Sequence, residues 1–482
     1  MDSKQAMGAS REDMRVGHGT KVVKRLQQNS LTTADITAVS MANTAPAMSF
    51  FFSFATIAAA AGIASPLAIV VAAIVILLKI NSLVEFTRVT PSTGSYISYI
   101  GKTFGPVAGV MAAWALSFGF IVAVGFVIAV LGGWTSLILQ QFLHVTVAWQ
   151  FFSILFVLVV GYLVYRGVKI STKWAAAMFA FELLLILVSM AAIIVTHWHR
   201  LSFSSFNPHY IKNGLAGMGL AFPLAVFLFI GVGNPGAMVE ETQNPRRAVP
   251  VAIYTATLLV TVIYVLMAWT TSVAFHNNAQ AIASQSVPFV VAASKALGPF
   301  TLLVYLAGLT STFASLIGAT NAQARMIFSA GREGLLPFEL GRVSRYGTPV
   351  SAIILYLGVA LTITLIWAHH GSPLTIAGVI ATLGTIPVAL VYLVLNLAVP
   401  VYYLRECRSQ FSWLRHLVIP IAGTLALILP LWGLIEPGQP APFNAFPWIV
   451  LGLLIVAWAY ALWRLRHIPD LADRVGSIIA DE

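Results

Sequence analysis

Twelve long apolar stretches constrain this chain more than any other feature. An α-helix needs about 20 mostly apolar residues to cross a bilayer, and each stretch comes near or exceeds that length. Their number and length exclude a β-barrel, whose strands show weak alternation over about ten residues. The pattern therefore predicts an all-α membrane protein with twelve transmembrane helices. The stretches lie at 34–62, 65–87, 106–139, 147–165, 171–196, 215–243, 249–275, 297–328, 349–368, 374–403, 416–435 and 444–464.

The composition requires a lipid environment. Of the 482 residues, 59% are hydrophobic and only 9% are charged, whereas a soluble domain has roughly 25% charged residues. So few charges cannot cover the surface of a soluble fold of this size, but lipid-facing side chains may be apolar. We therefore expect a multi-pass protein of the cell membrane, with the lipid bilayer as its main partner.

The basic residues predict the orientation of the chain. With twelve spans and a cytosolic N-terminus, all but four of the 27 Lys and Arg residues fall on the cytosolic side. The exceptions are Arg200, Lys212 and Lys295, which fall outside, and Lys79, which lies in the second span and is expected to extend toward the interface. This asymmetry follows the positive-inside rule and places both termini in the cytosol. Because the net charge of +11 is explained by orientation, we expect no nucleic-acid partner.

Two of the twelve stretches carry helix-breaking residues. Residues 40–49 contain Pro46, and residues 229–236 contain Pro235 beside three glycines. Proline removes a backbone donor and disrupts the preceding turn. The interrupted stretches are the first members of two successive five-helix units, a pattern typical of inverted-repeat transporters. Where a helix unwinds in the membrane, the freed amides would bind a carboxylate and the freed carbonyls an ammonium group.

Three local motifs resemble those of the amino acid–polyamine–organocation superfamily. They lie at 85–106, where an acidic residue, a proline and a Gly-x-Tyr run follow the second span, at 240–250, and at 321–337. Their order and spacing hold from about 32 to 435. The resemblance implies a leucine-transporter-type 5+5 inverted repeat with discontinuous helices 1 and 6 and two further helices. It divides the chain into a cytosolic tail (1–33), a ten-helix transport core (34–403), helices 11 and 12 (404–464) and a second cytosolic tail (465–482).

The resemblance also implies a substrate site at the two interruptions and a gate on the cytosolic face. Phe227 stands where relatives place an aromatic lid. Two departures bear on the substrate: residues 42–46 replace a Gly-x-Gly type sequence, and Gly233 replaces an acidic residue. The expected gating residues are Tyr96, Glu240, Glu241 and Arg325. The expected substrate-binding residues are Ser40, Met41, Ala42, Asn43, Thr44, Ala45, Phe227, Ile230, Gly231, Val232, Gly233 and Asn234.

Glu182 is the only one of the 16 acidic residues that lies deep in a predicted span. A carboxylate at the bilayer centre costs about 2.5–3.5 kcal/mol on insertion scales and marks a functional candidate. The resemblance places Glu182 beside the first and eighth helices, where sodium-coupled relatives hold an ion. We therefore expect Glu182 to carry a coupled proton.

These features predict a secondary transporter of amino acids that works by proton-coupled symport or exchange. The alternative is an amine or polyamine transporter in which Glu182 is the counter-ion of the substrate. An enzyme is not expected, because all ten histidines fall in predicted loops or helix ends and no nucleophile–base cluster is visible. A channel is not expected, because no charged rings are visible. We expect no cofactor and no metal, since the single Cys407 can form neither a disulfide nor a zinc cluster.

Overall fold

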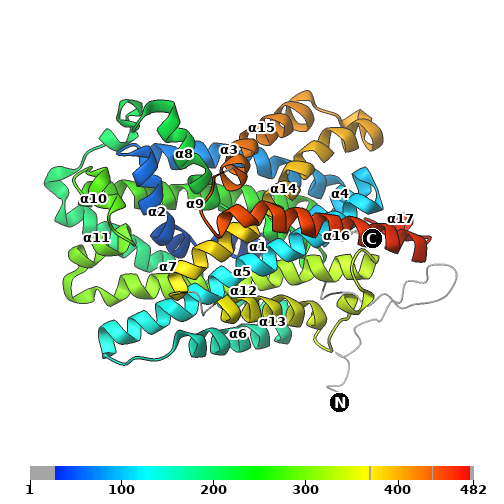
Figure 1. Ribbon diagram of the computed structural model, residues 1–482, viewed down its shortest axis with the longest axis horizontal. Coiled ribbons are helices and arrows are strands. Elements are labelled where there is room, and N and C mark those ends of the chain that lie inside the picture. The colour runs from blue at the N-terminus through cyan, green and yellow to red at the C-terminus, as the bar shows by residue number, and fades with distance from the viewer. Residues whose placement is uncertain (1–25, 27, 368–370, 437, 478–482) are drawn as a thin grey trace, which may run out of the picture.

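The computed structural model describes residues 26, 28–367, 371–436 and 438–477. In this part of the chain the structure is helical, and its only β-type pairings are two isolated bridges, Leu31 with Thr242 and Gly62 with Ile211. Figure 1 shows the arrangement of the helices. They are α1 (Thr33–Thr44), α2 (Pro46–Ala61), α3 (Ser65–Val89), α4 (Tyr96–Phe104), α5 (Pro106–Leu143), α6 (Trp149–Arg166), α7 (Val168–Thr196), α8 (Gly214–Phe227), α9 (Pro245–Ala274), α10 (Ala279–Ala283), α11 (Pro288–Leu297), α12 (Leu302–Glu333), α13 (Val350–Trp367), α14 (Pro373–Glu406), α15 (Ile419–Ile435), α16 (Phe446–His467) and α17 (Leu471–Arg474).

Eleven helical segments of the described chain are long and apolar enough to cross a membrane. They correspond to eleven of the twelve predicted stretches, with α1 and α2 together forming the first. The remaining stretch, 215–243, is not one helix: α8 ends at Phe227, and after a series of turns a 3₁₀ segment, η4, covers Asn234–Glu241. The two halves are each too short to span a bilayer alone, because a spanning helix needs about 20 residues.

The long helices run roughly along the long axis of the molecule, so the bundle has two distinct ends (Figure 1). One end carries α10 and α11, and we call it the α10 end. There, Arg200 lies 3.0 Å from His276, which joins the two loops predicted to lie outside the cell. The opposite end carries α17, and we call it the α17 end. These two loops, which were predicted to share one side of the membrane, thus lie together.

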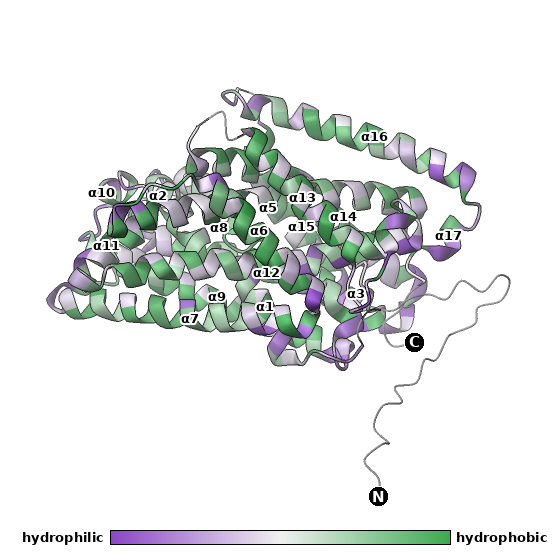
Figure 2. Ribbon diagram, turned by 90° about the horizontal axis from the view of Figure 1, so that it is seen from below, coloured by the Kyte–Doolittle hydropathy of each residue, from purple (hydrophilic) through white to green (hydrophobic). Residues whose placement is uncertain are grey.

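The outer surface of the bundle is apolar. Figure 2 shows hydrophobic residues along the helices, with hydrophilic residues gathered toward their ends. Large apolar side chains are exposed on α6 and α16 in particular, with Leu158 65% and Trp448 73% exposed. Apolar patches of this extent are rare on soluble monomers. This surface is therefore the one that faces lipid.

The start of α1 follows from its sequence. The Thr32 hydroxyl accepts a hydrogen bond from the Asp35 amide at 3.3 Å, and the Asp35 carboxylate accepts one from the Thr32 amide at 2.8 Å. This reciprocal capping box satisfies two of the amides that a helix start leaves free. It fixes the start of α1 at Thr33, one residue before the first predicted stretch.

The C-terminal segment packs on the bundle instead of forming a free tail. Leu471 in α17 is fully buried, and the Gly476 amide donates to the buried Glu333 carboxylate at 3.1 Å. Ser98 in α4 donates to the other oxygen of Glu333 at 2.8 Å. The segment therefore joins α4 to the end of α12. Neither α4 nor α17 was predicted from the sequence, because both are too short to show a clear apolar period.

Candidate functional site

The first interrupted helix breaks at Ala45. This residue has left-handed backbone angles (φ 47°, ψ 69°) and separates α1 from α2. Pro46 then occupies the first position of α2, where its missing N–H is not needed. The break predicted within residues 40–49 is therefore present, and Pro46 is its cause.

The second interruption extends from Leu228 to Gly233. Gly231 has a φ of +101°, which L side chains rarely adopt, and a Cβ there would lie 3.1 Å from the Asn43 carbonyl oxygen. The glycine is therefore required both by the backbone angle and by the close approach. The amides of Gly231 and Gly233 donate no hydrogen bond within the described residues, and the Ile230 carbonyl accepts none there.

The two interruptions touch each other. The Asn43 side-chain amide donates to the Gly231 carbonyl at 3.1 Å. The Tyr264 hydroxyl of α9 donates to the Leu228 carbonyl at 2.8 Å and lies 3.5 Å from the Thr44 carbonyl oxygen. Two unwound segments separated by almost 190 residues in the sequence therefore form one polar centre inside an apolar bundle.

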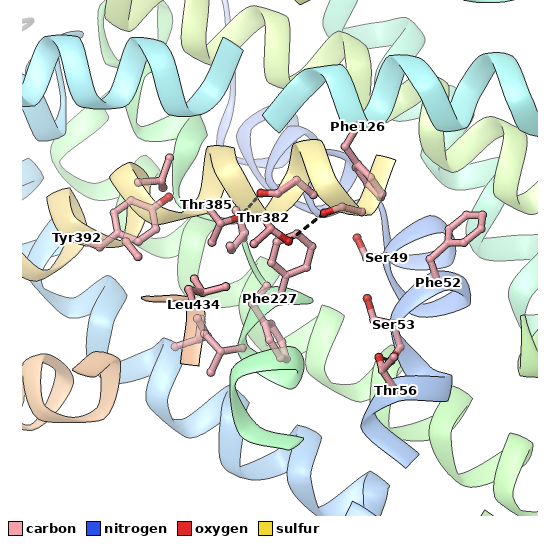
Figure 3. A pocket seen from close by; sticks show the side chains of 18 of the residues that line it. Ser49, Phe52, Ser53, Thr56, Phe126, Phe227, Thr382, Thr385, Tyr392 and Leu434 are labelled. Carbon is pink, nitrogen blue, oxygen red and sulfur yellow. Dashed lines mark hydrogen bonds between the residues drawn. The ribbon is translucent and has the colours of Figure 1, made fainter. Parts of the chain in front are cut away.

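Two cavities adjoin this centre. The smaller, of about 90 Å³, lies between the interruptions and includes Ser315 and Gln323 of α12. The larger, of about 310 Å³, runs along α2 as far as Thr56 and is also lined by α14 and α15. Figure 3 shows Phe227, Tyr392 and Ser49 around it. The cavities are contiguous because they share Ser49, Phe126, Phe227, Ile230, Ala381 and Thr385.

The structure brings half of the expected substrate-binding residues to the cavities. Those that line them are Asn43, Thr44, Phe227, Ile230, Gly231 and Asn234. The other six line neither of these cavities: Ser40, Met41, Ala42, Ala45, Val232 and Gly233. All six are buried, because an irregular segment exposes only part of its surface to one side. Phe227, the expected lid residue, is half-buried and lines both cavities.

Glu182 of α7 lies at the first interruption, beside α1, α2 and α12. Its Oε1 accepts a hydrogen bond from the Ala47 amide at 2.8 Å, and its Oε2 has no hydrogen-bond partner among the described residues. The Met48 amide donates to the Ser311 hydroxyl at 3.2 Å. Glu182 is fully buried and lines neither cavity. Its predicted position between the first and eighth spans is therefore observed.

This arrangement corrects one expectation. The amides at the start of α2 were expected to bind a substrate carboxylate, but none is free: Pro46 has no N–H, Ala47 donates to Glu182, Met48 to Ser311, and Ser49 to the Ala45 carbonyl. A helix N-terminus favours a negatively charged group, and at the start of α2 the Glu182 side chain already occupies that position. An anion would have to bind elsewhere.

Lys79 also differs from expectation. It does not extend toward the interface, because it is only 4% exposed and lines the larger cavity. Its ammonium nitrogen lies 3.3 Å from the centroid of the Tyr392 ring and 3.4 Å from the Tyr96 hydroxyl. Within the described residues, it is the one side chain with a formal charge among those that line the two cavities. A cation–π contact with a desolvated ammonium stabilises this position.

Buried ion pairs join η4 to α12 toward the α17 end. Arg325 of α12 binds the Glu241 carboxylate through two nitrogens, and both side chains are fully buried. Arg332 pairs in the same way with Glu240. The Ser30 and Leu31 amides donate to the Glu241 carbonyl at 2.7 and 2.8 Å. The start of α1, η4 and α12 are thereby fastened together.

Tyr96, the fourth expected gating residue, lies beside the larger cavity, because its hydroxyl is 3.4 Å from the ammonium nitrogen of Lys79, which lines that cavity. A Cβ on Gly233 would lie 2.8 Å from the Tyr96 hydroxyl, and the Tyr96 ring packs 5.0 Å from that of Tyr392 between centroids. It therefore packs against the second interruption itself.

Sequence reasoning missed the contribution of α14 to the site. The larger cavity is lined by three residues of α14 that share one helix face, because they are spaced by four and seven residues: Ala381, Thr385 and Tyr392. Lys79 of α3, which also lines this cavity, was missed as well. The signal that could have indicated this contribution is a set of polar residues repeated on one face of an apolar span. In α14 this signal is weak, because it consists only of Thr382, Thr385 and Tyr392 among many apolar residues.

Comparison with known proteins agrees with this architecture. The model of the amino acid permease family matches residues 35–468. The chain belongs to this family, which lies within the superfamily that the three motifs indicated, and the family consists of membrane transporters and not of enzymes.

Among its relatives is the branched-chain amino acid permease BcaP of Lactococcus lactis subsp. cremoris (strain MG1363). The two are 24% identical over 77% of this chain and 81% of the relative. BcaP of Bacillus subtilis (strain 168) is also 24% identical, over 85% of this chain and 88% of the relative. The methylthioribose transporter of Bacillus subtilis is 24% identical over 80% and 82%.

Proposed function

We propose that this chain is a secondary active transporter that carries amino acids across the cell membrane, with twelve membrane segments of which the first ten form a 5+5 inverted repeat. The observation that supports this most directly is the contact between two interrupted segments, Asn43 with Gly231, beside a cavity. Facing interruptions near the bilayer midplane are the usual substrate site of inverted-repeat transporters. The named relatives include permeases of branched-chain amino acids, and this makes leucine, isoleucine and valine the first candidates.

The conformation supports an alternating-access mechanism. The larger cavity extends toward the α10 end along α2, whereas Glu241–Arg325 and Glu240–Arg332 join the elements at the α17 end. With both termini in the cytosol, as the distribution of Lys and Arg favours, the α17 end is cytosolic and the gate there is closed. Opening this gate separates η4 from α12, so both ion pairs and Tyr96 act as gating residues.

Coupling to protons rests on Glu182. Its carboxyl group accepts the Ala47 amide at the start of α2, so its protonation state acts on the helix that borders the cavity. A negative carboxylate holds the helix N-terminus strongly, and a protonated one holds it weakly. Proton binding and movement of α2 are thereby linked in one contact.

The rival function is transport of amines or polyamines with Glu182 as counter-ion. Two observations disfavour it. Glu182 lines neither cavity, and the charged side chain that does line one is Lys79, which would repel a cation.

The decisive experiment is uptake by purified protein in liposomes. Labelled L-leucine, L-isoleucine and L-valine are offered with and without an inward pH gradient, and counterflow is measured in parallel with polyamines as competitors. Saturable amino acid uptake with counterflow supports the proposal. In a second arm, labelled polyamines and each of the twenty amino acids are offered to the same liposomes. Uptake of a polyamine without uptake of any amino acid would replace the proposal with the rival function.

A further inference from the structure

We propose that Lys79 binds the carboxylate of the substrate. The backbone amides of the first interruption cannot do so, because none of them is free at the start of α2. The proposal rests on the amino acid transport proposed above and adds the group that recognises the acid. It follows from three features of the described chain: the use of the α2 amides, the position of Lys79, and the free backbone groups of the second interruption.

The first feature is the occupied start of α2. Ala47 and Met48 donate to Glu182 and Ser311. A second carboxylate placed there would meet the Glu182 carboxyl group and find no donor, and like charges repel strongly in a medium of low dielectric constant. The anionic part of a substrate is therefore excluded from the place where the half-helix dipole would otherwise hold it.

The second feature is an ammonium group without an anion. No carboxylate of the described residues lies within 4 Å of the Lys79 ammonium group, although the residue is only 4% exposed. A buried charge that is not paired is costly, and charged residues inside the membrane by default mark a substrate or ion pathway. Tyr392 and Tyr96 hold the amine but supply no negative charge.

The third feature places Lys79 next to the second interruption. The Lys79 ammonium nitrogen lies 3.4 Å from the Tyr96 hydroxyl. Gly233 lies against the same hydroxyl, since a Cβ added to this glycine would be 2.8 Å from it. The ammonium group also lies over the Tyr392 ring, and the Tyr392 hydroxyl is 3.5 Å from Asn234 Oδ1 in the second interruption. A carboxylate held by Lys79 in the larger cavity would therefore lie close to this interruption. The Ile230 carbonyl accepts no hydrogen bond in the described chain, and because Ile230 lines both cavities, this carbonyl remains for the substrate ammonium group.

The substrate class follows from this polarity. A solute with a carboxylate at one end and an ammonium group at the other meets complementary groups, whereas a simple amine meets only the carbonyl and is repelled by Lys79. The specificity for the acid is then produced by one side chain of α3, and the interrupted helix α1–α2 contributes shape and the link to Glu182.

The test compares wild type with Lys79→Met, which keeps the length of the side chain and removes its charge. Lys295→Met, on an exposed face of α11, is the matched control. The transport probe is labelled L-leucine. Two unlabelled competitors separate its groups: 4-methylpentanoate keeps the carboxylate and lacks the amine, and 3-methylbutylamine keeps the amine and lacks the carboxylate.

We expect Lys79→Met to raise the half-saturating concentration of L-leucine at least about tenfold, as loss of a buried charged partner does. Competition by 4-methylpentanoate should disappear, and 3-methylbutylamine should compete better than in wild type. The variant should melt no lower than wild type without ligand, because the lost cation–π contact with Tyr392 is offset by removal of an unpaired buried charge. The Lys295→Met control should match wild type in every measurement.

Equal half-saturation and equal competition in Lys79→Met and wild type would overturn the assignment. If wild-type protein transports no amino acid, the proposed function fails, but the carboxylate site is still tested by binding. Stabilisation of wild type against heat by 4-methylpentanoate, absent in Lys79→Met, would support the site under that outcome. The same shift in both proteins, or in neither, would refute it.

Discussion

We expect the gate proposed at the α17 end to open on one nearly isosteric change, Glu241→Gln. Arg325 and Glu241 are both fully buried, and removing one partner of a buried pair leaves an uncompensated charge at a cost of about 3–5 kcal/mol. The guanidinium keeps its bonds to the Asn321 carbonyl and side chain, at 2.5 and 3.2 Å, so the lower value applies. Since every 1.4 kcal/mol is tenfold, the closed conformation loses about two orders of magnitude relative to the open one.

The assay is the labelling rate of a cysteine that only an open gate exposes. In a Cys407→Ser background, Gln323→Cys places a thiol in the smaller cavity. The Gln323 Oε1 that it replaces accepts no hydrogen bond in the described chain. A membrane-impermeant maleimide is added from the α17 side. We expect Glu241→Gln to accelerate labelling by one to two orders of magnitude, up to the rate of an open site.

Two further variants make the result interpretable. Glu406→Gln breaks the ion pair of Glu406 with Arg405, both about half exposed, and should leave labelling unchanged because such pairs contribute about 0–1 kcal/mol. Glu241→Gln with Arg325→Met removes both buried charges and should label more slowly than Glu241→Gln alone. A folded Glu241→Gln protein that labels at the wild-type rate would show that this pair does not hold the gate.

Three other predictions concern coupling, the cavity and orientation. Glu182→Gln, which imitates a permanently protonated acid, should retain counterflow and lose accumulation driven by a pH gradient; full gradient-driven uptake would make Glu182 a structural acid. Gly231→Leu should abolish the heat stabilisation given by L-leucine, because φ is +101° and the Asn43 carbonyl is 3.1 Å away, while Phe227→Ala should weaken it; unchanged ligand-induced shifts in both would mean the site lies elsewhere. Arg200→Cys should label from outside intact cells, and Ser3→Cys, which lies outside the described residues, should not; external labelling of Ser3→Cys would contradict the twelve-span topology.

The membrane fold and the two interruptions could be predicted because their signals are local. An apolar run of about 20 residues indicates a membrane-spanning segment, and a proline such as Pro46 or Pro235 disfavours a continuous helix. Glu182 could be placed for a similar reason, since one acid in an apolar span stands out. The family motifs then supplied the order of the elements.

The composition of the cavities could not be predicted, because it depends on how helices rotate against each other. Lys79 is an example: its position near the end of a span suggested a side chain that reaches the interface, yet α3 turns it inward onto Tyr392. Tyr392 lies more than 300 residues away in the sequence. No local pattern connects a lysine with a ring so distant, and only packing brings them together.

The seating of the C-terminal segment bears on how the protein is handled in practice. Glu333 receives one of its hydrogen bonds from the Gly476 amide, so a chain cut before that residue would leave a buried carboxylate short of a donor, at about 1–3 kcal/mol. Affinity tags and fluorescent fusions are commonly attached at this end. A junction after residue 477 preserves the contact, whereas one placed at Ile468, where α16 has just ended, would remove the buried Leu471 as well. Expression screens of shortened variants should therefore treat residues 468–476 as part of the folded body.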